Sequence, residues 1–227
     1  MQRLWIDKWI VVSTIAAVLA GCGGEDPGSN GGASEGPLLP WTEGNTWTYD
    51  VTDAMGVTTQ KVTTVGAAEP VGGSGPNATL MAFKIVTQKG VMDETISWQG
   101  VVGDKVVRYR EQAFGATSGM LALEEHWDPY KLHVDGSAER TAAGVSWLEI
   151  YGETKISNGN PITAEARDRW TVISASERVE VPAGTFDAVV LQKVGGNSKT
   201  YWYVRGVGKV KETGGQTEEL VDYTVAP

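Results

Sequence analysis

The chain has 227 residues, with 19 Lys and Arg against 28 Asp and Glu, which gives a formal charge of −9. This acidic balance argues against a nucleic-acid-binding protein and against docking on anionic lipid through a basic patch, because both need clustered Lys and Arg. The sequence contains one Cys and two His, so a disulfide framework and a cysteine-rich metal cluster are excluded. We expect no cofactor and no metal ion.

Residues 1–21 have the pattern of a signal peptide. Basic residues precede an uncharged run, 9–20, which is too short to span a bilayer but typical of the apolar part of a signal peptide. The run leads into Leu19-Ala20-Gly21-Cys22, which resembles the lipobox of bacterial lipoproteins. The resemblance implies cleavage before Cys22 and attachment of acyl chains, such as palmitate, to that residue. Residue 23 is Gly rather than Asp, which in that family implies the outer membrane. An ordinary secretory signal that happens to contain a cysteine is the alternative.

Residues 22–40 form the predicted lipidated tether. Gly23–Pro40 contains six Gly and three Pro, and its aliphatic residues larger than Ala are Leu38 and Leu39. Such a segment buries too little apolar surface to offset the entropy of ordering it. We therefore expect a membrane partner bound through the lipid anchor, a flexible linker, and a single β domain over residues 41–227.

From Trp41 onward, short segments rich in β-branched and aromatic residues recur between Gly, Asn and Pro turn signals, as expected for strands. These segments are 46–51, 59–65, 80–87, 104–111, 146–153, 169–174, 186–193 and 199–204. The connections are too short for parallel crossovers. The fold class predicted is therefore all-β, an antiparallel curved sheet or barrel-like meander.

Two pseudo-repeats of about 70 residues, 41–112 and 141–212, emerge when the chain is aligned with itself. Trp47 aligns with Trp147 at an offset of 100, and Trp98 aligns with Trp202 at an offset of 104. Repeated units of this size usually complete one another's core. The alignment predicts a pseudo-twofold architecture with all four Trp inside, and a chance match of common strand and turn patterns is the alternative.

The second unit resembles a loose group of uncharacterised bacterial envelope proteins. The resemblance rests on Val181-Pro-Ala-Gly-Thr-Phe186, an aromatic strand at 201–203, and Gly206-Val-Gly-Lys-Val-Lys211. Pro182 and Gly184 are typical of a turn. This resemblance implies a fold type and no particular reaction.

The seven Trp of residues 41–227 are candidates either for core packing, the favoured interpretation, or for lining an apolar ligand pocket. A second candidate site is a hairpin with its turn at Asp128–Lys131. In this hairpin His126 lies opposite His133 and Glu124 lies opposite Asp135 on one polar face, where the two imidazoles and two carboxylates could bind a transition-metal ion. A solvated polar face is the simpler interpretation, and no metal site is predicted.

Catalytic patterns are weak. Ser146 lacks the second Gly of a nucleophile elbow, and the glycine pairs lack the context of a nucleotide-binding loop. We therefore expect a non-enzymatic, lipid-anchored envelope protein that binds or scaffolds, with an envelope protein or an apolar ligand as partner and no nucleic acid. The alternatives are a carrier or sensor for an apolar ligand and, less favoured, a hydrolase acting on glycans.

Overall fold

The computed structural model describes residues 36–196 and 198–226. The predicted signal peptide, the predicted attachment residue Cys22 and most of the predicted tether lie outside the described residues. Among the residues described, no helix is long and apolar enough to cross a membrane.

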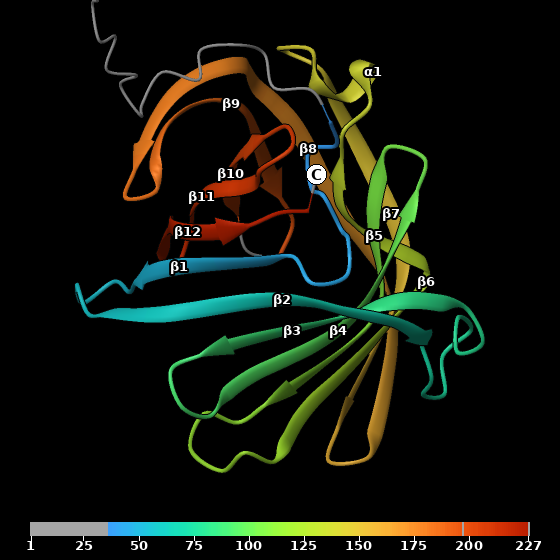
Figure 1. The fold of residues 1–227 in the computed structure, drawn as a ribbon. Coiled ribbons are helices and arrows are strands. Elements are labelled where there is room, and N and C mark those ends of the chain that lie inside the picture. The colour runs from blue at the N-terminus through green and yellow to red at the C-terminus, as the bar shows by residue number, and fades with distance from the viewer. Residues whose placement is uncertain (1–35, 197, 227) are drawn as a thin grey trace, which may run out of the picture.

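The described chain forms a closed antiparallel barrel in which each strand pairs with its neighbours in sequence and β1 pairs with β12 (Figure 1). The elements are β1 (Thr46–Thr52), β2 (Thr58–Pro70), β3 (Met81–Lys89), β4 (Asp93–Val102), β5 (Lys105–Phe114), β6 (Leu121–Asp135), α1 (Ala138–Thr141), β7 (Ser146–Ser157), β8 (Asn160–Val181), β9 (Gly184–Val194), β10 (Lys199–Val204), β11 (Gly208–Thr213) and β12 (Thr217–Thr224). The predicted all-β antiparallel barrel is confirmed.

Alternation of buried and exposed side chains explains why these segments are strands. In β1 the buried residues are Trp47, Tyr49 and Val51, and the residues between them are partly exposed. This is the period of two that puts one face of a strand toward the interior. The predicted turn at Pro182 lies between β8 and β9.

The predicted turn at Asp128–Lys131 is wrong, because β6 runs through this segment as one strand. On one side of β6, residues 124–128 pair with β7. On the other side, Arg110 pairs with His126 and Arg108 pairs with Lys131, so the residues between them bulge away from β5. A bulge tolerates Pro129, since no N–H is needed there. The signal typical of a turn therefore marks a bulge.

One end of the barrel is plugged by residues 36–45. In an antiparallel meander, alternate connections lie at opposite ends. The segment before β1 therefore meets the β4–β5, β6–β7 and β10–β11 connections. Pro37 O accepts a hydrogen bond from Gly206 N at 2.9 Å, and Ala226 N donates to Asn45 Oδ1 at 2.8 Å. Both termini of the described chain thus lie at this plugged end.

The main apolar core sits beneath the plug. Leu38 and Leu39 are buried in it together with strand residues such as Val107 and Leu132. Residues 36–40, which the sequence analysis assigned to the tether, thus belong to the fold. The pair Leu38-Leu39 is too short to be recognised as core within a Gly-rich sequence, yet its side chains fill the plugged end of the barrel.

The two pseudo-repeats correspond to β1–β5 and β7–β11, and their starts share a backbone arrangement. Gly44 N donates to Val65 O at 2.9 Å, and Val65 N donates to Asn45 O at 2.9 Å. Gly144 N donates to Val172 O at 2.9 Å, and Val172 N donates to Val145 O at 2.8 Å. The same bonds at both starts fit the duplication inferred from the sequence.

Candidate functional site: a charged lumen

The barrel encloses two adjoining cavities, which together we call the lumen. The larger, about 580 Å³, is named the Trp170 chamber after a residue of its wall. The smaller, about 370 Å³, is the Trp47 chamber. Both are lined by a shared layer made of Arg108, Glu111, His133, Lys199, Lys209 and Glu212. The lumen is therefore one space divided by a charged layer.

The lumen extends to the end of the barrel opposite the plug. The Trp47 chamber begins at Leu39 and Trp41 and reaches Lys89 and Gln216, which are next to the β3–β4 and β11–β12 turns. In the Trp170 chamber, the side chain of Lys155 is 51% exposed. This exposure indicates that the lumen meets solvent at the end we call the open end.

The lining is cationic although the protein is acidic. Among the described residues, nine of the chain's 19 Lys and Arg line the lumen, but only six of its 28 Asp and Glu do. Most of the excess lies in the Trp170 chamber, where the cations are Arg108, Lys131, Lys155, Arg167, Lys193, Lys199 and Lys209, and the carboxylates are Glu111, Glu153, Asp168 and Glu212. Such a cavity attracts anions.

Within the shared layer, one cation is fully neutralised. Lys209 donates to Glu218 at 2.7 Å and also contacts Glu212. Burial alone would lower the pKa of Lys209, but the two carboxylates outweigh it and hold that pKa well above its usual value. Lys61 contacts Glu218, and Lys199 contacts Glu212. Three Lys thus share two Glu, with Lys209 bound to both carboxylates, so the role we assign to Lys209 is structural.

Arg108 has unused hydrogen-bonding capacity. Its Nη1 lies 3.3 Å from Glu111 Oε2, while its buried Nε has no hydrogen-bond partner among the described residues. Trp170, also on the wall of the Trp170 chamber, has a buried Nε1 that likewise lacks an acceptor. Both groups are donors, and a buried donor without an acceptor costs about 1–3 kcal/mol. A ligand acceptor that reached either atom, through a small shift of the side chains that cover it, would relieve this cost.

Lys193 lies on the same wall, between β8 and β10. Its Nζ is 3.8 Å from Asp168 Oδ2 and 5.8 Å from the centre of the Trp170 ring. Burial lowers the pKa of Lys193 to about 8, and Asp168 only partly offsets the effect. Asp168 also accepts a hydrogen bond from Tyr151 Oη at 2.9 Å. Lys193 is thus charged at neutral pH but incompletely compensated, as expected of a group that meets an anion.

His133 faces the shared layer as a neutral imidazole. Burial, followed by the charge of Arg108 and of nearby Lys residues, holds its pKa well below the ordinary value. Its Nδ1 is 2.7 Å from Gln99 Oε1, which also accepts a bond from Trp41 Nε1. Because an amide oxygen only accepts, Nδ1 carries the proton. This leaves Nε2 as an acceptor, and His133 adds no positive charge to the lumen.

His126 lies on the outer face of the barrel wall, so the predicted juxtaposition of His126 with His133 is wrong. It contacts Glu124 at 2.7 Å and is buried beneath the β2–β3 connection, where a side chain at Gly73 or Gly75 would collide with its ring. The continuous path of β6 separates the two imidazoles. Among the described residues, no cluster of three or more His, Cys, Asp or Glu side chains is placed to hold a metal ion.

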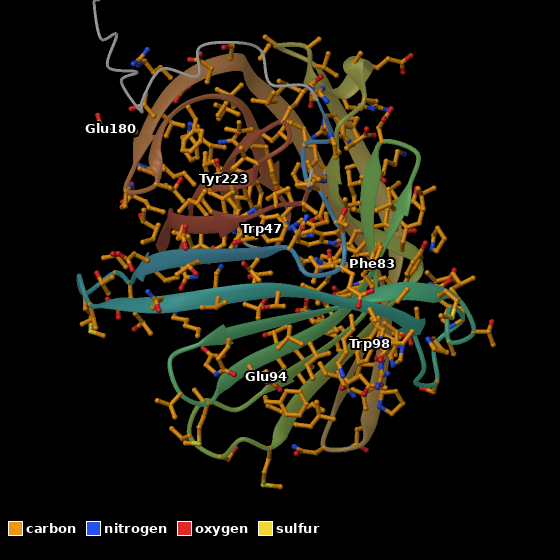
Figure 2. All side chains as sticks on the ribbon, in the orientation of Figure 1. Trp47, Phe83, Glu94, Trp98, Glu180 and Tyr223 are labelled. Carbon is orange, nitrogen blue, oxygen red and sulfur yellow. The ribbon has the colours of Figure 1, made fainter. Side chains whose placement is uncertain are left out.

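The predicted Trp residues divide between core, lumen and outer face. Trp47 and Trp127 are fully buried. Trp41, Trp47 and Trp170 also line the chambers, beside charged groups. Trp98 lies on the outer face of β4, because its neighbours Ser97 and Gln99 face the lumen, and it is buried there against Val71 and Ala82 (Figure 2).

Trp202 is only partly buried, and its Nε1 donates to Glu177 at 2.9 Å. The prediction that Trp47, Trp98, Trp147 and Trp202 all lie inside the barrel is therefore wrong for Trp98 and Trp202. Strand alternation fixes which residues share a face but not which of the two faces is the interior.

The lumen residues Arg108, Lys193 and Glu212 were not candidates in the sequence analysis. Their polar faces suggested solvent, and only the closed topology turns these faces inward. In the structure, Arg108-Tyr-Arg-Glu111 and Lys209-Val-Lys-Glu212 occupy equivalent places, because Arg110 pairs with Trp98 and Lys211 pairs with Trp202. The sequence alignment at an offset of 104 hides this equivalence, since it sets Lys105 against Lys209. A cation three residues before Glu, repeated at corresponding strands, marks the shared layer.

Two solved structures resemble this fold. One, from Bacteroides fragilis, is described as an exported protein with a YmcC-like fold; it has a TM-score of 0.52 and 13% identity, over 84% of this chain and 100% of that one. Another, from Parabacteroides distasonis, is described as a lipoprotein; it has a TM-score of 0.48 and 12% identity over the same shares. No protein-family model and no curated protein matches the sequence. At these identities the likeness shows the fold alone.

Proposed function

We propose that the chain is a lipid-anchored protein of the cell envelope, held in the outer membrane through Cys22, and that its lumen binds a small anionic molecule without transforming it. The exported protein of similar fold and the lipobox support the envelope location. One observation carries the ligand class: the orphaned buried atoms of the Trp170 chamber, Arg108 Nε and Trp170 Nε1, are both donors in a cation-rich wall.

The charges favour an anion over the purely apolar ligand considered from the sequence. An apolar molecule in the Trp170 chamber would displace water from seven cations and compensate none of them, which is costly. An anion would pair with Arg108 and Lys193 while its apolar part lay against Trp170 and Tyr201.

The carboxylates of the lumen support binding rather than glycan hydrolysis. A glycosidase needs one carboxyl group that stays protonated as the acid. Cationic and N–H partners hold the pKa values of Glu153, Glu212 and Glu218 below their ordinary range despite burial. These groups are ionised at neutral pH and serve as counter-ions.

A matched pair of probes tests the ligand class. Calorimetry with 1-naphthoate and its neutral amide, 1-naphthamide, compares molecules of similar shape that differ in charge. We expect naphthoate to bind at least about tenfold more tightly, equivalent to about 1.4 kcal/mol. Trp170→Phe, which removes the donor but keeps an aromatic ring, and Arg108→Met should each reduce this preference, while the exposed control Lys84→Met should not. Equal affinity for the two probes would refute the proposal.

The preference should also depend on pH. Because the pKa of Lys193 is about 8, this residue loses its charge as the pH rises through 8. Naphthoate affinity should therefore fall between pH 7 and pH 9. The Lys193→Met variant should show a smaller fall, because Lys61 in the adjoining Trp47 chamber also has a pKa of about 8. The affinity for naphthamide should stay level over the same range.

Anchoring has its own test. Cys22→Ser removes the only thiol available for acylation, and the polar residues that follow cannot hold a bilayer by themselves. We expect labelled palmitate to be absent from the variant and membrane retention to be lost on fractionation. Unchanged, detergent-dependent association of the variant with membranes would contradict the assignment.

A further inference from the structure

The hairpins at the open end carry the most exposed apolar side chains of the described molecule. Met55, Val91, Met120 and Ile162 have exposed fractions of 85%, 94%, 71% and 72%, above every other large apolar residue described. They belong to the β1–β2, β3–β4, β5–β6 and β7–β8 hairpins, one in each. Figure 1 shows these four hairpin ends following one another along the lower left edge of the barrel. We call the four residues the apolar rim.

Hydrogen bonds order two of the rim turns. Asp53 Oδ1 accepts bonds from Met55 N and Val57 N, both at 2.9 Å. The β5–β6 turn is closed by Gly119 N donating to Gly115 O at 2.8 Å. Three rim turns carry a second exposed apolar side chain, namely Val57, Met92 and Leu121. Seven exposed apolar side chains thus stand on four hairpins at one end of the barrel.

We propose that the apolar rim docks on a lipid bilayer, with its side chains in the headgroup region and the open end of the lumen facing the membrane. The rim side chains stand on separate hairpins rather than in one continuous patch. A protein partner would need a matching pocket for each tip, whereas a bilayer accepts apolar side chains at any lateral spacing.

The length of the preceding chain allows this orientation. Gly36 lies at the plugged end, and the 13 residues between it and Cys22 give 14 Cα-to-Cα steps, which can span at most about 49 Å. The ten residues of β4 are about 33 Å long, and tilt shortens this to about 25 Å along the barrel axis. An anchored chain can therefore pass the barrel wall and still let the rim reach the same membrane. The proposal relies on the proposed anchor only to supply that membrane.

Vesicle co-sedimentation of a non-acylated chain, residues 23–227, tests docking apart from anchoring. The vesicles are phosphatidylcholine, because the net charge of −9 works against anionic lipid. The rim variant combines Met55→Ser, Val91→Ser, Met120→Ser and Ile162→Ser. Its control combines Met81→Ser, Val101→Ser, Ile150→Ser and Ile173→Ser, which alter apolar residues that are also exposed but lie outside the rim. Thermal unfolding of both verifies that the fold is kept.

We expect the parent chain to sediment with vesicles, the rim variant to lose at least about tenfold in partition, and the control to stay within about twofold of the parent. Binding should persist at high salt, since it depends on apolar burial. A parent chain that does not sediment with vesicles, or a control that loses as much as the rim variant, overturns the proposal. A parent that sediments equally without vesicles identifies a second copy as the occupant and overturns it too.

Discussion

The strand pairs β4–β5 and β10–β11 carry the same arrangement of residues in the two units of the barrel. Toward the lumen, Arg108 pairs with Glu111 and Lys209 pairs with Glu212, each three residues apart. On the outer face, Arg110 lies 4.3 Å from the centre of the Trp98 ring. Lys211 lies 6.0 Å from the Trp202 ring. Equivalent positions thus place equivalent chemistry on the same face.

The difference between the two pairs comes from what covers them. The β2–β3 connection covers Trp98, and Arg110 is fixed by Val71 O at 2.9 Å and Glu124 at 3.0 Å. Within the described residues, Trp202 has no comparable cover and is only partly buried. In the lumen, Lys209 has two carboxylate partners whereas Arg108 has one and an orphaned Nε. At this equivalent position, Lys209 of the second unit ties the barrel together, whereas Arg108 of the first unit keeps an unused donor.

The largest expected difference in unfolding free energy is between variants of Lys209 and Arg108. Lys209→Met removes a buried charge that holds Glu212 and Glu218, and breaking such a network should cost about 3 kcal/mol of unfolding free energy. Arg108→Met releases only the partly exposed Glu111 and should cost about 1 kcal/mol. Urea unfolding of both variants measures the difference. Equal costs would show that Lys209 is not the structural tie.

The same network sets the response to acid. Its cations lower the pKa of Glu218 to about 2 despite burial, below the ordinary value of about 4.3 in the unfolded chain. A lowered folded-state pKa gives stability that is fully present above about pH 4.3 and is lost as the pH falls toward 2. Unfolding free energies between pH 6 and pH 2 should fall in this window, and Glu218→Gln should flatten the fall.

The outer faces are distinguished by their tryptophans. Trp98→Ala empties a covered site and should cost about 3 kcal/mol. Trp202→Ala removes a partly exposed ring and should cost about 1 kcal/mol. Denaturant unfolding of the two variants is the measurement. Equal costs for Trp98→Ala and Trp202→Ala would instead support the prediction from the sequence repeat, in which the two tryptophans are buried alike.

The smallest contrast in stability is between His126 of β6, which pairs with Arg110, and Glu219 of β12, which pairs with Lys211. His126→Ala removes a buried partner of Glu124 and should cost about 1–3 kcal/mol. Glu219, 2.7 Å from Lys211, forms a surface ion pair, and Glu219→Ala should change stability by at most about 0.5 kcal/mol. If His126→Ala were also neutral on thermal unfolding, the β2–β3 connection would not be a tight cover.

Strand positions could be predicted because Trp47, Tyr49 and Val51 alternate with polar residues, and the chain is strand-like throughout. The β6 bulge could not, because Asp128-Pro129 has the composition of a turn and only pairing with β5 and β7 keeps the strand continuous. The lumen could not be predicted either, because Arg108 and Lys193 resemble solvent-facing residues until the barrel closes around them. Burial of Leu38 depends in the same way on long-range contacts.

The account's central claim is that Arg108 and Trp170 offer unused donors to an anion inside the barrel. The most direct measurement is the anomalous difference map of crystals soaked in bromide. We predict a bromide peak in the Trp170 chamber, within hydrogen-bond distance of Arg108 Nε or Trp170 Nε1, that disappears in Trp170→Phe together with Arg108→Met. Bromide peaks confined to the outer surface of the barrel would contradict the claim.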